Sequence, residues 1–256
     1  MNRRLLSRIG RNMTRWISIP ALRSLRRRVG ALENVVEKLL EEEQYAPDST
    51  RALNGQQGRQ HIFAQIVRDS GIETIVETGT YLGDTTGWMH KVSGLPVYTS
   101  EINRHFHLLA KRRLAGYKDI HLVHGDSVDA LRKLAASPVS NLQAFFYLDA
   151  HWYESLPLFE ELRIIVSHWN NFVVMVDDFE VPGDDGYGFD DYGFRRSLSM
   201  SCFGKAFREL GLTAYFPVLS STQETGARSG CVVLAKFGSA AAGQLDKLAL
   251  LRSATD

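Results

Sequence analysis

Between residues 57 and 237, short apolar runs alternate with longer amphipathic segments. Seven runs rich in β-branched and aromatic residues predict strands at 72–77, 97–101, 120–124, 144–149, 172–177, 213–217 and 231–237. Six segments with apolar residues three and four apart predict helices at 57–70, 83–91, 104–114, 127–135, 154–168 and 197–210. This alternation favours an α/β domain over 57–237, with a doubly wound, mostly parallel, seven-stranded Rossmann-like sheet and helices on both faces.

The first 46 residues have a different pattern, typical of a basic amphipathic helical extension. A heptad stripe over 22–39 is formed by Leu22, Leu25, Val29, Leu32, Val36 and Leu39. Three interpretations stay open: packing on the chain's own domain, homo-oligomerisation, and peripheral contact with anionic lipid. The stretch 47–58, rich in Pro, Asp, Ser, Asn and Gly, predicts a linker. We expect 238–256 to form a C-terminal helical tail.

Charge is divided unevenly along the chain, although the net charge is only +1. Residues 1–30 hold nine arginines and no acid, whereas the remainder holds 21 basic and 29 acidic side chains, a net charge of −8. Only Trp16 accompanies these arginines as a stacking aromatic, which argues against nucleic acid as a partner. An organellar transit peptide is an alternative interpretation of this start.

The few cysteines favour a reducing compartment, and the hydropathy of the chain argues against a membrane span. Cys202 and Cys231 are the two cysteines, and no CxxC or Cys/His spacing indicates zinc. No run approaches the ~18 apolar residues of a membrane span. We therefore expect a cytoplasmic or membrane-peripheral protein.

Acidic residues end two of the apolar runs, with Asp149 after 144–148 and Asp177 and Asp178 after 172–176. Ligands of open α/β sheets bind past the carboxyl ends of the strands, so these three carboxylates should meet at one rim. Their mutual repulsion would be costly without a cation. The sequence therefore predicts a metal site of Asp149, Asp177 and Asp178. In the alternative interpretation, one aspartate caps a helix or pairs with an arginine.

Three further strand ends carry acids. The first is the turn Glu77-Thr-Gly79-Thr-Tyr81-Leu-Gly83, whose glycines allow close approach to the backbone but lack the GxGxxG spacing of dinucleotide sites. Glu101 ends the next strand, where an acid can bind ribose hydroxyls. Asp126 and Ser127 follow the third strand and could contact an adenine edge. Ordinary turns and helix caps explain each motif alone.

In order and spacing, these motifs resemble the class I S-adenosylmethionine-dependent methyltransferases. The turn is similar to that of catechol-type, divalent-metal-dependent O-methyltransferases, and Phe146-Tyr-Leu-Asp149-Ala-His151-Trp152 resembles the macrocin type. The resemblance implies that Glu77 and Gly79 line the methionine end of S-adenosyl-L-methionine, that Tyr81 and Gly83 of the same turn also bind the cofactor, that Glu101 binds ribose, and that Asp126 and Ser127 bind adenine. It also implies that Asp149, Asp177 and Asp178 hold Mg²⁺ or another divalent cation.

His151 is the candidate general base, because an imidazole titrates near neutral pH. Asp149, two residues before it, is expected to take part in catalysis as well. Catechol-type enzymes carry a lysine where this chain has Trp152. A role for His151 as a metal ligand is the alternative. The Gly- and Asp-rich segment 180–193 predicts a mobile lid, with Tyr187 and Tyr192 touching the substrate.

The expected function is therefore S-adenosylmethionine-dependent, Mg²⁺-dependent O-methylation of a small polyhydroxylated or glycosylated metabolite. A metal-independent methyltransferase is one alternative. A non-catalytic cofactor-binding scaffold that acts through its basic N-terminal helices is the other.

Overall fold

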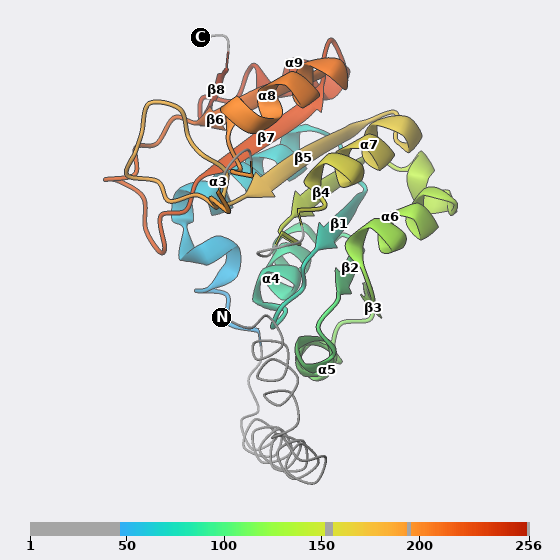
Figure 1. The fold of residues 1–256 in the computed structure, drawn as a ribbon. Coiled ribbons are helices and arrows are strands. Elements are labelled where there is room, and N and C mark those ends of the chain that lie inside the picture. The colour runs from blue at the N-terminus through green and yellow to red at the C-terminus, as the bar shows by residue number, and fades with distance from the viewer. Residues whose placement is uncertain (1–46, 152–155, 194–195, 255–256) are drawn as a thin grey trace, which may run out of the picture. The chain divides into compact units, whose positions relative to one another are not determined.

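An eight-stranded sheet forms the centre of the computed structural model, which describes residues 47–151, 156–193 and 196–254 (Figure 1). The strand order is β3-β2-β1-β4-β5-β7-β6-β8. The strands are β1 (Thr74–Thr78), β2 (Val97–Glu101), β3 (Ile120–His124), β4 (Ala144–Leu148), β5 (Phe172–Asp177), β6 (Leu212–Pro217), β7 (Cys231–Lys236) and β8 (Leu251–Ser253). The predicted extension 1–46 and its stripe 22–39 lie outside the described residues, so the roles considered for them stay predictions.

Most of the sheet is parallel, as the alternating pattern predicts. Strands β3, β2, β1, β4 and β5 pair in parallel, whereas β7 joins β5, and β6 joins both β7 and β8, in antiparallel register. The chain forms β1 first, then β2 and β3 on one side of it, and then β4 and β5 on the other side of β1. In open α/β sheets ligands bind at the carboxyl ends of the strands where the strand order reverses, which here is between β1 and β4.

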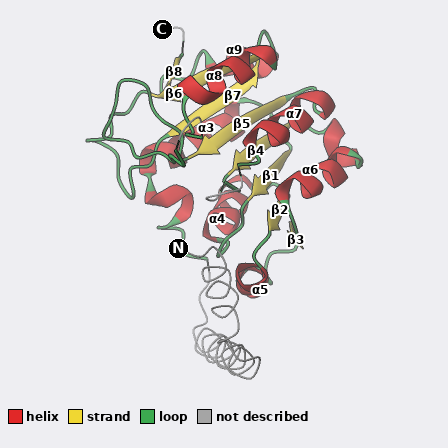
Figure 2. Cartoon of the chain, viewed as in Figure 1, coloured by secondary structure: helices red, strands yellow, loops and turns green. Residues whose placement is uncertain are grey.

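Helices cover both faces of the sheet (Figure 2). They are α3 (Gln57–Asp69), α4 (Asp84–Ser93), α5 (Arg104–Arg113), α6 (Ser127–Ala135), α7 (Leu158–His168), α8 (Met200–Glu209) and α9 (Ala240–Leu245). One apolar core lies between the sheet and α6, α7 and α8. The other lies between the sheet and α3, α4 and α9. None of the helices within the described ranges is long and apolar enough to cross a bilayer.

Local sequence explains where the central elements begin and end. Every residue of β1, β4 and β5 is buried, which agrees with the continuous apolar runs of β4 and β5. Asn103 caps α5 and Asp126 caps α6, each with a side-chain oxygen that accepts from two backbone amides. Both helices therefore start directly after the strand that precedes them.

Two segments differ from the sequence expectation. The predicted helical tail contains only the short helix α9, and it continues into β8, which pairs with β6 and buries Leu251. The predicted linker contains a 3-10 helix (Ala52–Gly55), in which Leu53 is fully buried and donates its backbone N–H to Thr85 Oγ1. Both segments are short, and tertiary contacts rather than a local periodic pattern determine their conformation.

Candidate active site

The turn between β1 and α4 lies directly against the end of β4. Gly79 has φ +88° and Gly83 has φ +80°, a region that glycine enters without strain. A Cβ at Gly79 would overlap the backbone carbonyl oxygen of Asp149. The predicted cofactor turn and the predicted metal strand are therefore in contact, and glycine is the residue that permits it.

Glu77 is buried at the end of β1 beneath this turn. One carboxylate oxygen, Oε2, accepts hydrogen bonds from the hydroxyls of Thr86 and Thr99. The other, Oε1, has no partner among the described residues. Burial raises the pKa of Glu77 to about 7, against the effect of the two threonines. This carboxyl group thus has one free acceptor beside the turn.

Glu101 is held at the end of β2 by backbone amides from both sides. Its Oε2 accepts from Tyr81 N at 2.8 Å, and its Oε1 accepts from Asn103 N at 2.7 Å. Each oxygen keeps a further lone pair for a ligand hydroxyl. Tyr81 reaches this position with a left-handed backbone, at φ +49°, while its ring packs on Phe106.

Asp126 caps α6, because its Oδ1 accepts from Val128 N and Asp129 N at 2.9 and 3.2 Å. Ser127, the first residue of that helix, is buried. A cavity of about 190 Å³ lies between α6 and strands β1 to β3, and Asp126 lines it. The structure thus places Asp126 at the same rim as Glu101, but with one oxygen already used by the helix.

Two of the predicted metal ligands, Asp149 and Asp178, form one cluster with the predicted general base His151. Ligand atoms of Asp149, His151 and Asp178 all lie within 4.8 Å of one another. Asp149 is about one-third exposed at 36%, and the His151 side chain is buried. His151 Nε2 lies 3.9 Å from Asp149 Oδ1 and has no hydrogen-bond partner among the described residues. The cluster thus combines two carboxylates with a buried, unpartnered imidazole nitrogen.

The carboxylates of this cluster repel each other. Partial burial and the nearby Asp177 raise the pKa of Asp149 above its usual range, and the same causes raise the pKa of Asp178 to about 7. Burial lowers the pKa of His151 and favours the neutral imidazole. Asp178 also has a strained backbone, at φ +48°. Backbone strain at Asp178 and repulsion between carboxylates therefore occur in the same cluster.

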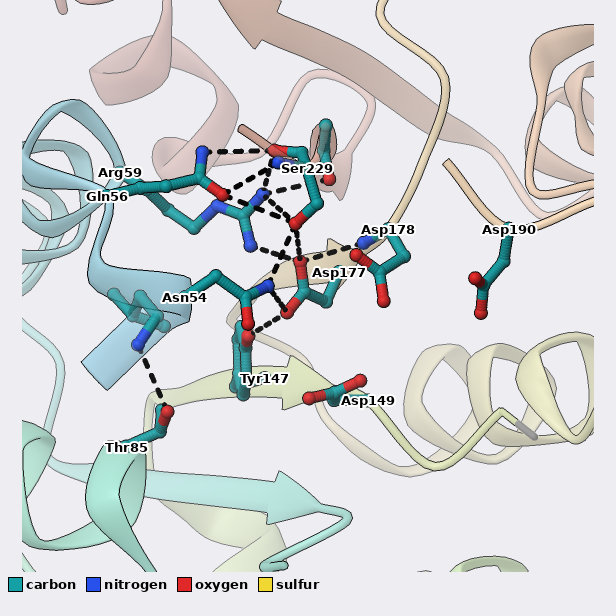
Figure 3. A network of polar contacts seen from close by, with 12 residues as sticks. Asn54, Gln56, Arg59, Thr85, Tyr147, Asp149, Asp177, Asp178, Asp190 and Ser229 are labelled. Carbon is teal, nitrogen blue, oxygen red and sulfur yellow. Dashed lines mark hydrogen bonds and ion pairs between the residues drawn. The ribbon is translucent and has the colours of Figure 1, made fainter. Parts of the chain in front are cut away.

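Asp177 is not part of this cluster, which corrects the predicted metal set of Asp149, Asp177 and Asp178. Its carboxylate is fully buried and forms an ion pair with Arg59 (Figure 3). It also accepts from Tyr147 OH, from Asn54 Nδ2 at 2.9 Å and from Asp178 N at 2.7 Å. With both oxygens used by donors, Asp177 anchors the end of β5, whereas the Asp178 carboxylate belongs to the cluster with Asp149 and His151.

Sequence reasoning missed Arg59, Asn54 and Asp190. Arg59 occupies an apolar-face position of α3, three and four residues before Ile62 and Phe63, and an arginine in such a stripe signals a buried partner. Asn54 lies in the segment that was predicted as a linker. Asp190 places Oδ2 3.9 Å from His151 Nε2, so an acid from the 180–193 segment lies beside the cluster.

Tyr187 and Tyr192 have different environments, and one expectation about them is wrong. Tyr187 is buried in the core and donates its hydroxyl to Leu219 O at 2.9 Å, so it is not a substrate-contacting lid residue. Tyr192 lies at the cluster, where its hydroxyl donates to Asp190 Oδ2 and contacts His151 O at 3.4 Å. Asp184 also holds this segment by accepting from Ser221. These contacts tie the 180–193 segment to its neighbours at Asp184 and Tyr192, and its role as a mobile lid stays a prediction.

Comparison with known proteins supports the fold. No protein-family model matches the sequence, and no curated protein matches it. An O-methyltransferase from Bacillus cereus, in complex with SAH, is 16% identical with a TM-score of 0.53, over 81% of this chain and 90% of that chain. The O-methyltransferase TomG from Streptomyces achromogenes, involved in tomaymycin synthesis, is 18% identical with a TM-score of 0.50, over 71% and 80%. At such identities the likeness establishes the fold, and it confirms the predicted Rossmann-like class.

Proposed function

We propose that this chain is an S-adenosylmethionine-dependent O-methyltransferase that uses a divalent cation and acts on a hydroxyl of a small polyhydroxylated or glycosylated metabolite. The observation that carries this proposal is the contact between Gly79 and Asp149, which brings the cofactor turn and the acidic cluster to one crevice. The fold supports it, since the Bacillus cereus neighbour holds SAH on the same architecture.

On the cofactor side, the acids at successive strand ends fit a nucleoside with a charged amino-acid tail. Glu101 offers two anchored oxygens to ribose hydroxyls, and the free Oε1 of Glu77 suits the amino group of the methionine part. The Gly79–Gly83 turn lets the ligand approach the backbone. Asp126 and Ser127 are assigned the adenine edge.

On the acceptor side, the cluster fits a divalent cation. The unpartnered His151 Nε2 and the raised pKa values of Asp149 and Asp178 indicate lone pairs and charge that lack a partner. A bound cation would hold two oxygens of the acceptor and lower the pKa of the one to be methylated. Asp149, His151 and Asp178 are the residues that would hold it.

In the reaction, the carbon–sulfur bond to the methyl group breaks as the new carbon–oxygen bond forms, and the hydroxyl proton leaves. The chain contributes orientation and a pocket that excludes water. His151 has two candidate roles, cation ligand and proton acceptor, and Nε2 is the atom concerned in both. Tyr192 and Asp190 line the acceptor side of the crevice.

A metal-independent methyltransferase is the second candidate, and one observation favours it. With a pKa of about 7, Asp178 carries a proton in a large share of molecules at neutral pH. A protonated carboxyl group relieves the repulsion in the cluster without a cation. Turnover that is indifferent to EDTA would select this candidate.

Calorimetric titration of S-adenosylmethionine, with Mg²⁺ and then with EDTA, tests the proposal. Glu101→Gln should weaken cofactor binding at least about tenfold, because a hydrogen bond to a charged group contributes about 1.5–3 kcal/mol. Glu209→Gln, in an exposed ion pair with Lys205 on α8, is the control and should bind normally. Transfer of labelled methyl groups to a panel of sugars, glycosides and catechols then identifies the acceptor class. If no condition gives cofactor binding, the proposal is wrong.

A further inference from the structure

The imidazole of His151 lies in the acidic cluster and, although it is buried, lacks a hydrogen-bond partner at Nε2 among the described residues. Its side chain is 2% exposed. Nε2 lies 3.9 Å both from Asp149 Oδ1 and from Asp190 Oδ2. These distances exceed the ~3.2 Å limit of an ordinary hydrogen bond. Two ligands bound to one ion at about 2.1 Å can lie as far as about 4.2 Å apart.

We infer that His151 Nε2 is a cation ligand together with Asp149 and Asp178, and that this imidazole makes the site selective for a first-row transition dication such as Mn²⁺, Fe²⁺, Co²⁺ or Zn²⁺ over Mg²⁺. The inference rests on the cation site of the proposed function. Mg²⁺ and Ca²⁺ bind oxygen donors almost exclusively, whereas imidazole nitrogen suits transition metals. A site made for Mg²⁺ would gain nothing from a buried nitrogen.

Charge balance agrees with this ligand set. Asp177 is paired with Arg59, which offsets part of the charge that it adds to the cluster. Asp149 and Asp178 then supply two negative charges, which a dication neutralises, and a neutral imidazole adds a donor without adding charge. A further carboxylate, that of Asp190, places Oδ2 3.9 Å from His151 Nε2.

The backbone at His151 and at Asp178 is also held from the protein side. Tyr192 OH contacts the His151 backbone carbonyl oxygen at 3.4 Å and bonds Asp190. The Asp178 backbone is fixed from behind by Asp177, which accepts from its N–H at 2.7 Å. A preorganised donor set of this kind discriminates between metals by ligand type and geometry.

Manganese binding to the metal-stripped full chain tests the inference directly. Free Mn²⁺ is followed by electron paramagnetic resonance, and pulsed measurements on the bound ion report a coordinated nitrogen. We expect nitrogen coupling in the unaltered chain, and we expect Mg²⁺ at about 100-fold excess to leave most Mn²⁺ bound.

The variant His151→Asn replaces the nitrogen by a carbonyl oxygen donor. It should lose the nitrogen coupling and bind Mn²⁺ at least about tenfold more weakly, while Mg²⁺ affinity changes little. His168→Asn is the matched control, because His168 bonds Ile164 O and precedes β5, about 20 Å from the strand end that carries the cluster. It should keep both the coupling and the affinity. Melting temperature and S-adenosylhomocysteine affinity show whether each variant is folded.

The outcomes separate the inference from the proposed function. Bound Mn²⁺ without nitrogen coupling, or Mg²⁺ that competes at equal concentration, overturns the inference and leaves the cation site standing. Binding of S-adenosylhomocysteine without binding of any cation overturns the inference and favours the metal-independent candidate. If neither ligand binds, the proposed function fails as well.

Discussion

Replacing Asp177 by Asn should be among the most damaging isosteric substitutions in this domain. The two carboxylate oxygens accept from different donors: Oδ1 from Arg59 and the Asp178 amide, and Oδ2 from Asn54 and Tyr147. An asparagine must turn its NH₂ group toward one of these pairs, so donors face donors in either orientation. It also leaves the Arg59 guanidinium, 1% exposed, without its counter-charge.

The expected cost follows from this burial. Removing one partner of a buried ion pair costs about 3–5 kcal/mol. For a domain of this size, that corresponds to a fall in melting temperature of about 6–20 °C. Chemical denaturation followed by circular dichroism measures the free energy of unfolding, and thermal unfolding gives the second value.

Asp129→Asn is the matched control for this substitution. It removes the same charge from an exposed pair with Arg132, whose side chains are 68% and 54% exposed, and it should cost less than about 1 kcal/mol. If Asp177→Asn also costs less than about 1 kcal/mol, the anchoring assigned to the Arg59–Asp177 pair is wrong. If stability is kept while cation affinity is lost, Asp177 is a metal ligand after all.

Two further predictions each compare a pair of like residues in different environments, first Glu161 with Glu160 and then Gly79 with Gly94. Burial raises the pKa of Glu161 to about 7 from 4.5, so the folded state keeps a proton that the unfolded chain loses, and stability falls as the pH rises from 4.5 to 7. Glu161→Gln should remove this pH dependence, up to about 3 kcal/mol between pH 4.5 and 7. Arg163 lowers the pKa of Glu160 from 4.5 to about 2, so Glu160→Gln should lower stability above pH 4.5, and that loss should disappear as the pH falls from 4.5 to 2. Denaturation at several pH values checks both, and an unchanged slope between pH 4.5 and 7 for Glu161→Gln refutes the assignment. Gly79→Ala should abolish cofactor binding and destabilise the fold through its overlap with Asp149, while Gly94→Ala, with φ +70° but open space, should cost only about 1 kcal/mol and bind normally in calorimetry.

The sequence by itself determined the order of the elements and most of their boundaries. The predicted ranges 97–101, 120–124 and 127–135 coincide with β2, β3 and α6. Their boundaries are specified by neighbours in sequence, namely a short strand-forming run and the capping side chain, Asn103 or Asp126, that starts the next helix. The same local logic placed Glu77, Glu101, Asp149 and Asp178 at strand ends, and hence at one rim.

Only the tertiary structure decided which of two adjacent aspartates faces the cluster. Val173 and Met175 point to the face covered by α3, so the alternation along β5 turns Asp177 to the same face, where Arg59 lies. The backbone then enters a left-handed conformation at Asp178 and directs its carboxylate to Asp149 and His151. Partners more than 100 residues apart determine this division, and no local pattern encodes their position. The buried Tyr187 and the strand β8 were missed for the same reason.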